Sequence, residues 1–200
     1  MVDKMDALDG KPVEELVEEL ERLRKEVEEL RLFKELAYRD SLTGLRNRRY
    51  LMKRLHEEIH RVQREEDSLF SIMMIDVNEL KAVNDSYGHA EGDNVLRWTA
   101  EFLVAQMRCH DVACRTGGDE MVLILSGTGV EGCHQLSARI RENLKEENLE
   151  REVPVNLSIG TATWRSGVGT LQALLDEADR AMYADKVRCR EANRSVGKSA

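Results

Sequence analysis

The chain has 200 residues, of which 42% are hydrophobic, 4% aromatic and 34% charged, and its formal net charge is -8. This length allows one domain of ordinary size plus an additional segment. An acidic chain is poorly suited to bind nucleic acid polymers, because that binding depends on neutralising phosphates. No stretch approaches the roughly 18 consecutive apolar residues of a membrane span, and the first residues lack the apolar run of a signal peptide. We therefore expect no membrane partner.

The cysteines are Cys109, Cys114, Cys133 and Cys189, and no two of them form a C-x-x-C pair. Histidines are not grouped with them at the spacing of metal ligands, which argues against a zinc site. Free thiols in a chain of this size are typical of a reducing compartment. We therefore expect a cytoplasmic protein.

Residues 1–11 are predicted to be a leader and residues 12–38 a helix. Its apolar residues recur at spacings of three and four: Val13, Leu16, Leu20, Leu23, Val27 and Leu30. This is the a/d pattern of a coiled coil, and the remaining positions are mostly charged. One interpretation is a single amphipathic helix lying on its own domain. A helix this polar has little reason to be stable alone, so a parallel homodimer through residues 12–38 is favoured.

A domain over residues 39–193 follows, and residues 194–200 are predicted to be a tail. Periodicity of 3.6 predicts helices at 47–65, 79–86, 92–107, 131–147 and 170–189. Apolar runs and alternation predict strands at 69–77, 111–115, 120–125 and 155–163, with a hairpin turn at 116–119. Helices interleaved with strands and one hairpin indicate an α+β fold, with a mostly antiparallel sheet flanked by helices.

Two carboxylates are candidates for a metal site. Asp76 ends the apolar run at 69–77, and Asp119 follows two glycines in the predicted hairpin turn. Each has an ordinary explanation alone, since Asp76 could cap the next helix and Gly-Gly-Asp-Glu is a good turn. If the hairpin lies beside the Asp76 strand, the carboxylates converge. Converging carboxylate oxygens, together with the phosphates of a bound nucleotide, are the ligands that hold Mg²⁺.

Four motifs in chain order resemble those of the GGDEF family. They are Asp40-x-Leu42-Thr43-Gly44-Leu45-x-Asn47-Arg48, Asp76-Val77-Asn78 through Asn84-Asp85, Gly88-His89 and Gly92-Asp93, Arg115-x-Gly117-Gly118-Asp119-Glu120-Met121, and Ala178-Asp179-x-Ala181-Met182-Tyr183-x-x-Lys186. Together they cover about residues 40–190. The helix at 12–38 resembles the signalling helix that often precedes such domains.

The resemblance implies a fold related to polymerase palms and nucleotidyl cyclases, and a diguanylate cyclase that condenses two GTP into cyclic di-GMP and two pyrophosphates. It also implies a metal site formed by Asp76, the Val77 carbonyl and Asp119, with Mg²⁺ as cofactor and Mn²⁺ as a substitute. Asp119 occupies the family's position for a metal-bound proton acceptor, and its neighbour Glu120 is the alternative acceptor. Lys81 would stabilise charge on the phosphates.

The resemblance also implies substrate contacts. Asn84 and Asp93 would recognise the guanine edge, because an amide and a carboxylate match its acceptors and donors. Lys186 and Arg190 would bind the terminal phosphates, four residues apart on one helix face. His89 could contact substrate or serve as a structural loop residue. Departures from the family pattern include Met121, which is expected in the core, and the Cys189-Arg190-Glu191 ending, which weakens the assignment of Arg190.

A second site is suggested by Arg108-x-x-Asp111, at the family's usual distance before the signature. In relatives this motif binds cyclic di-GMP and inhibits the enzyme, and Arg139 matches a secondary arginine of that site. An ordinary explanation remains open, since a cation is favoured at a helix end.

Three functions are compatible with these patterns. The first is an active cyclase in which a homodimer brings two GTP-loaded domains face to face. The second is a catalytically silent module that senses cyclic di-GMP, which the intact set of catalytic residues argues against. The third is a cyclase that makes mixed dinucleotides, which Asp93 argues against.

Overall fold

The computed structural model describes residues 12–65, 68–165 and 169–196. They belong to two compact units, and the chain divides between them after Tyr38. The predicted leader at 1–11 lies outside the described residues, as do the last four positions of the predicted tail. None of the described helices combines the length and the apolar character needed to cross a membrane.

The first unit contains helix α1, Val13–Ala37, which confirms the helix predicted there. Pro12 directly precedes it, and proline is well tolerated at a helix start because no hydrogen bond is lost. No residue of α1 is buried. The predicted stripe is solvent-accessible, with Val13, Leu20, Leu23, Val27 and Leu30 between 46% and 73% exposed. This unit therefore carries an apolar face with no partner among the described residues, and dimerisation through it stays a prediction.

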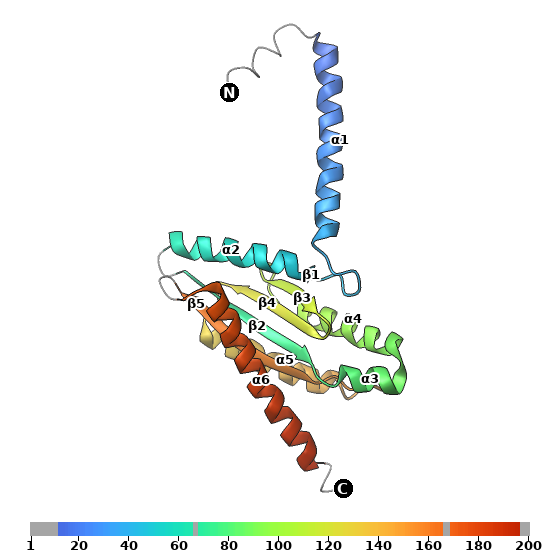
Figure 1. Ribbon diagram of the computed structural model, residues 1–200, viewed down its shortest axis with the longest axis vertical. Helices are drawn as coiled ribbons and strands as arrows, with labels where there is room; N and C mark the ends of the chain where they lie inside the picture. The colour runs from blue at the N-terminus through green and yellow to red at the C-terminus, as the bar shows by residue number, and fades with distance from the viewer. Residues whose placement is uncertain (1–11, 66–67, 166–168, 197–200) are drawn as a thin grey trace. The chain divides into compact units, whose positions relative to one another are not determined.

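The second unit is an α+β domain around a five-stranded sheet of order β1-β3-β4-β2-β5 (Figure 1). Its strands are β1 Arg46–Asn47, β2 Leu69–Val77, β3 Val112–Gly117, β4 Glu120–Ser126 and β5 Leu157–Arg165. Its helices are α2 Arg48–Arg64, α3 Leu80–Tyr87, α4 His89–Ala105, α5 Val130–Glu147 and α6 Leu171–Val196. The β1–β3 pair is parallel and the other pairs are antiparallel. The predicted α+β class with a mostly antiparallel sheet is confirmed.

Two apolar cores lie on the two faces of this sheet. One contains Met73, Ile75 and Val77 of β2 together with buried residues of α4 and α5. The other contains Phe70 and Ile72 of β2 together with buried residues of α2 and α6. Because side chains of a strand alternate between faces, Asp76 shares the α2 and α6 face.

Several predicted boundaries were wrong. The helix expected from residue 92 begins at His89, directly after Gly88, whose φ of +86° suits glycine. The last helix continues to Val196, so positions 194–196 belong to α6 rather than to a tail. Strand β1 was not predicted, because a two-residue strand has no periodicity and forms only by pairing with β3.

Helix α6 packs very closely on β5 at Gly160. A Cβ built on Gly160 would lie 2.1 Å from the Met182 nitrogen and 2.2 Å from the Ala178 carbonyl oxygen. Both atoms belong to the α6 backbone, so no side-chain movement could relieve the clash. The position therefore requires glycine, and it sets how near α6 lies to the sheet.

Candidate active site

Asp76 is a buried acid at the end of β2. Its side chain is 6% exposed, and its Oδ2 accepts a 2.7 Å hydrogen bond from Lys186 Nζ on α6. Its Oδ1 is also buried, and within the described part of the chain this oxygen has no hydrogen-bond partner. A buried carboxylate is stable only when its charge is compensated. Oδ1 of Asp76 remains available to a further cation.

The hairpin turn lies beside Asp76, which is the condition for the two acidic positions to come together. Strand β4 pairs with β2 so that Glu120 stands opposite Asp76, and the Val77 N–H donates to the Asp119 carbonyl at 3.0 Å. Gly118 opens the turn at a φ of +33°, a conformation that glycine adopts readily. A β-bulge at Thr116 interrupts the register just before the turn. Such bulges often re-aim side chains next to active sites.

The pairing of β2 with β4 places two acidic residues at one position of the sheet. Glu120 and Asp76 are directly opposite on the sheet, and like charges in that arrangement repel unless a cation lies between or beside them. No group of three or more His, Cys, Asp or Glu side chains capable of holding a metal occurs among the described residues. The predicted set of Asp76, Asp119 and the Val77 carbonyl would form a sparse oxygen site. Sparse sites suit Mg²⁺, which keeps several waters and shares phosphate oxygens with a substrate.

The segment that follows β2 contains a strained residue that sequence patterns did not indicate. Glu79 has a φ of +60°, and no other described non-glycine residue has a positive φ. This conformation costs an ordinary residue roughly 1–2 kcal/mol, and such strain tends to occur at functional sites. Glu79 turns the chain sharply from the Asp76 strand into α3, where the predicted phosphate contact Lys81 is exposed in the first turn.

The predicted guanine contacts lie on two successive helices. Asn84 on α3 lies against Gly92 on α4, because a Cβ on Gly92 would be 1.9 Å from Asn84 Oδ1. Asp93 is the next residue of α4. His89 is exposed at the start of α4, which leaves both of its predicted roles open.

Replacing Gly92 with alanine is expected to weaken GTP binding rather than the fold. The new Cβ would displace the Asn84 amide, and losing one well-placed hydrogen bond costs about 1–1.5 kcal/mol, or about tenfold in the Kd for a GTP analogue. Alanine is also the better helix former, so the unfolding midpoint should hardly change. Calorimetric titration with a non-hydrolysable GTP analogue measures the effect.

Asn84→Ala provides the comparison for this experiment. If Gly92→Ala acts by displacing Asn84, the double variant should bind no more weakly than Asn84→Ala alone. An unchanged Kd for the Gly92→Ala variant would contradict the arrangement.

The two predicted phosphate contacts on α6 differ in their surroundings. Lys186 is partly buried and reaches the Asp76 carboxylate, a residue 110 positions away in the chain. Arg190, one helical turn later, is exposed. The structure therefore connects Lys186 to the carboxylate site and leaves Arg190 on the surface.

Comparison with known proteins identifies the family and the fold. Residues 37–192 match the family described as diguanylate cyclase, GGDEF domain. The chain belongs to the GGDEF family. Among curated relatives, diguanylate cyclase A of Treponema denticola is 30% identical over 157 residues, which are 76% of this chain and 42% of that protein. Response regulator PleD of Caulobacter vibrioides is 37% identical over 171 residues, 83% of this chain and 37% of that protein.

Solved GGDEF structures are similar over most of the chain. The Pseudomonas aeruginosa diguanylate cyclase SiaD, crystallised with its activator SiaC, aligns with a TM-score of 0.73 and 31% identity, over 94% of this chain and 73% of that one. The coiled coil and GGDEF domain of DgcB from Caulobacter crescentus, in complex with c-di-GMP, aligns with a TM-score of 0.74 and 25% identity, over 87% and 92% of the two chains. The chain spans less than half the length of the two curated relatives above.

Arg115, the residue that opens the GGDEF signature, stabilises the turn through hydrogen bonds. Its Nε and Nη2 donate to the Gly118 carbonyl at 3.1 and 2.6 Å, and its Nη1 donates to Asp40 Oδ1 at 3.1 Å. Asp40 also accepts from the Thr43 N–H and hydroxyl. Burial alone would raise the pKa of Asp40, but the hydrogen bonds from Thr43 and Arg115 outweigh it and hold the pKa below its ordinary value. No local sequence pattern indicates this support, because it joins residues 75 positions apart.

Acid is expected to remove the contribution of Asp40 to stability. A carboxylate with a depressed folded-state pKa stabilises the fold above its unfolded pKa of about 3.9, and the stabilisation disappears as the pH falls through the folded value. We expect wild type to exceed Asp40→Asn by about 1–2 kcal/mol in unfolding free energy near pH 6. Urea unfolding should show this difference shrinking below about pH 4. A difference that stays constant down to about pH 3 would exclude a titrating Asp40 as its cause.

The three predicted product-binding residues also come together. Arg108, Asp111 and Arg139 line one depression of about 70 Å³ between the α4–β3 connection and α5. Asp111 Oδ2 accepts from the Arg108 N–H at 2.9 Å, and Arg139 donates to the Gln106 carbonyl at 2.6 Å. Both side chains thus also brace the local backbone, while Asp111 Oδ1 is buried without a hydrogen-bond partner in the described chain.

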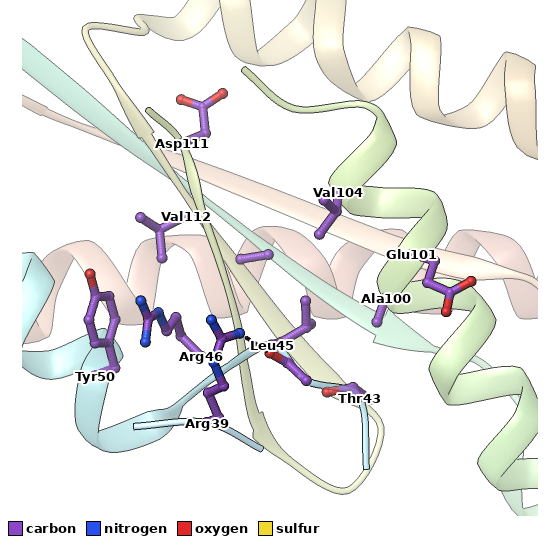
Figure 2. A pocket seen from close by; sticks show the side chains of 12 residues that line it. Arg39, Thr43, Leu45, Arg46, Tyr50, Ala100, Glu101, Val104, Asp111 and Val112 are labelled. Atoms are coloured by element: carbon purple, nitrogen blue, oxygen red, sulfur yellow. Dashed lines mark hydrogen bonds between the residues drawn. The ribbon is translucent and has the colours of Figure 1, made fainter. Parts of the chain in front are cut away.

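A larger cavity, of about 460 Å³, lies between β1, α4 and the start of β3 (Figure 2). Asp111 lies at one end of it, away from Arg39 and Arg46. Arg39 donates to the Gly44 carbonyl at 2.8 Å, and the Arg46 guanidinium lies 4.5 Å from the Tyr50 ring centre. Both cations are engaged by protein groups, and the predicted catalytic residues do not line this cavity.

Proposed function

We propose that this chain is an active cytoplasmic diguanylate cyclase that condenses two GTP into cyclic di-GMP and two pyrophosphates. The observation that carries the proposal is the arrangement at Asp76. This carboxylate lies opposite Glu120, beside the signature turn, pairs with Lys186 and keeps one buried oxygen available. The same groups would be needed to hold a triphosphate and its cation.

Asp76, Asp119 and the Val77 carbonyl would hold Mg²⁺. When bound, Mg²⁺ supplies charge neutralisation on the phosphates and lowers the pKa of the attacking 3′-hydroxyl. That hydroxyl attacks the α-phosphate of the other GTP, forming a phosphodiester bond and breaking the bond to pyrophosphate, and the reaction occurs twice. Asp119 or Glu120 accepts the proton that each hydroxyl loses. Glu120 is exposed and opposite Asp76, whereas Asp119 lies within the turn itself.

The remaining residues bind and orient GTP. Asn84, which lies against Gly92, and Asp93, the residue after Gly92, would hydrogen-bond the guanine edge. Lys81 would stabilise phosphate charge from the start of α3. Lys186 would exchange its bond with Asp76 for the terminal phosphates, assisted by Arg190 one turn later. Orientation of this kind supplies much of the catalysis in phosphoryl transfer.

Each domain provides one GTP site, so two copies must meet. The exposed stripe of α1 offers the means, because helices with this pattern associate in pairs and raise the effective concentration of the attached domains. The depression at Arg108, Asp111 and Arg139 would bind the product and inhibit the enzyme, since arginine side chains suit guanine edges and phosphates.

The test is an assay of the purified chain with GTP and Mg²⁺, with products identified by mass and oligomeric state measured by light scattering. We expect a dimer that forms cyclic di-GMP and stops when EDTA removes the metal. Product binding without turnover would refute the cyclase and favour a sensor. Supplying GTP and ATP together distinguishes a mixed-dinucleotide cyclase.

A further inference from the structure

Asp185 is a buried acid on α6 that neither the family motifs nor the proposed mechanism uses. The residue is 5% exposed. Its Oδ2 accepts from the Ile159 N–H of β5 at 2.8 Å and from Arg141 of α5 at 2.6 Å, and its Oδ1 accepts from Arg188 at 3.1 Å. These contacts join α6 to an edge strand and to α5 through one carboxylate.

The attachment point lies next to the catalytic carboxylate in the sheet. In the β2–β5 register, Ser158 pairs with Asp76 and Ile159 with Ile75. Asp185 is therefore bonded to β5 at Ile159, the residue after Ser158, which stands opposite Asp76. The following residue, Gly160, admits the α6 backbone at Met182, three positions before Asp185. Two consecutive residues of β5 therefore determine where this turn of α6 lies.

Lys186 is the next residue of the same turn, and its ammonium donates to Asp76 Oδ2 at 2.7 Å. A lysine side chain is long and loses considerable rotamer entropy when it is held in one place. A small shift of its helix would therefore change where the ammonium lies, and misplacement by about 1 Å can cost about 100-fold in rate. The bonds of Asp185 prevent such a shift.

Asp185 can anchor α6 through its charge, because its carboxylate remains ionised although it is buried. Burial would raise the pKa of Asp185, but the hydrogen bonds from Arg141 and the Ile159 N–H outweigh burial and lower it. The carboxylate therefore stays charged near neutral pH and keeps both arginine partners. A buried charge that retains its partners is held firmly, and removing it leaves those partners uncompensated.

We propose that Asp185 is a positioning residue for the reaction, which anchors α6 to β5 so that Lys186 reaches the Asp76 site. The inference rests on the proposed function of that site. Asp185 touches no substrate and acts through Lys186. A purely structural anchor would instead lower stability without any specific dependence on Lys186.

A double-mutant cycle on the full chain separates these two roles. Asp185→Ala is expected to lower kcat/KM for GTP at least about tenfold in the wild-type background. In the Lys186→Ala background the same change should lower it less than about twofold, because the residue it positions is already absent. Equal losses in both backgrounds would overturn the proposal.

Two further variants support the cycle. Asp185→Asn keeps a carbonyl oxygen for the Ile159 N–H while losing the charge, so it should fold and retain intermediate activity; a loss equal to that of Asp185→Ala would contradict anchoring through the strand. Asp176→Ala removes an exposed acid of the same helix, whose carboxylate has only Gln172 as a described hydrogen-bond partner, and it should leave kcat/KM unchanged.

A measurement without turnover distinguishes failure of this proposal from failure of the proposed function. The ¹³C signal of the Lys186 Cε, assigned by its loss in Lys186→Ala, reports the bond to Asp76 in the substrate-free protein. We expect Asp185→Ala to move it toward the signals of exposed lysines, and Asp176→Ala to leave it in place. An unmoved signal would overturn the positioning role even if wild type forms no cyclic di-GMP.

Discussion

Replacing Asp76 with asparagine is expected to lower the turnover of GTP on the order of 10³-fold, the scale seen when a group that stabilises transition-state charge is lost. The side chain keeps its shape but loses the charge that faces Lys186 and that would hold the cation. Stability should change little, because Lys186 is partly exposed and can turn its ammonium to solvent. Steady-state kinetics with GTP and Mg²⁺ and a thermal unfolding curve provide the two measurements.

Glu177→Gln is the matched control, since it removes an acid from the exposed surface of α6. It should retain wild-type turnover. If Asp76→Asn kept more than about a tenth of the wild-type rate, the assignment of Asp76 to the centre of the site would be wrong, since the lost charge is expected to cost far more.

Replacing Gly160 with alanine is expected to lower the unfolding free energy by about 3 kcal/mol, at the upper end of the usual cost of overpacking. The added methyl group would meet backbone atoms of Ala178 and Met182, so the whole of α6 has to move away from β5. For a domain of this size the melting temperature should fall by about 6–12 °C. Turnover should fall as well, because α6 carries Lys186.

Gly129→Ala is the control for the glycine experiment. A Cβ at Gly129 would make only ordinary contacts, at 3.7 and 3.8 Å from the Leu69 side chain, and its φ of -95° suits any residue. We expect a change below about 1 kcal/mol there. Similar melting temperatures for the two variants would show that α6 can adjust at Gly160 without cost.

Much of the domain could be predicted because its signals are local. The apolar run that ends in Asp76 predicts a strand. The glycines before Asp119 predict a turn, and Met121 was expected in the core, where its side chain is indeed fully buried. Each of these inferences needs only neighbouring residues.

The features that were missed depend on distant parts of the chain. No pattern indicates that Lys186 meets Asp76, because the pair forms only once α6 is placed on the sheet. The same is true of the close approach at Gly160, since periodicity shows which face of a helix is buried but not which backbone atoms touch. The left-handed Glu79 could not be predicted either, because a glutamate is an unfavourable choice for that conformation.

The contact between Arg115 and Asp40 bears on where this domain can be shortened. Asp40 lies before β1, yet its carboxylate is bonded to the arginine that holds the Gly118 carbonyl. A shortened chain that begins at α2 would keep most of both apolar cores and nearly all of the sheet. It would still leave the Arg115 guanidinium, which holds the signature turn, without its acidic partner Asp40. The smallest fragment that keeps the signature turn supported should therefore begin at Arg39, even though a stable fold could begin later.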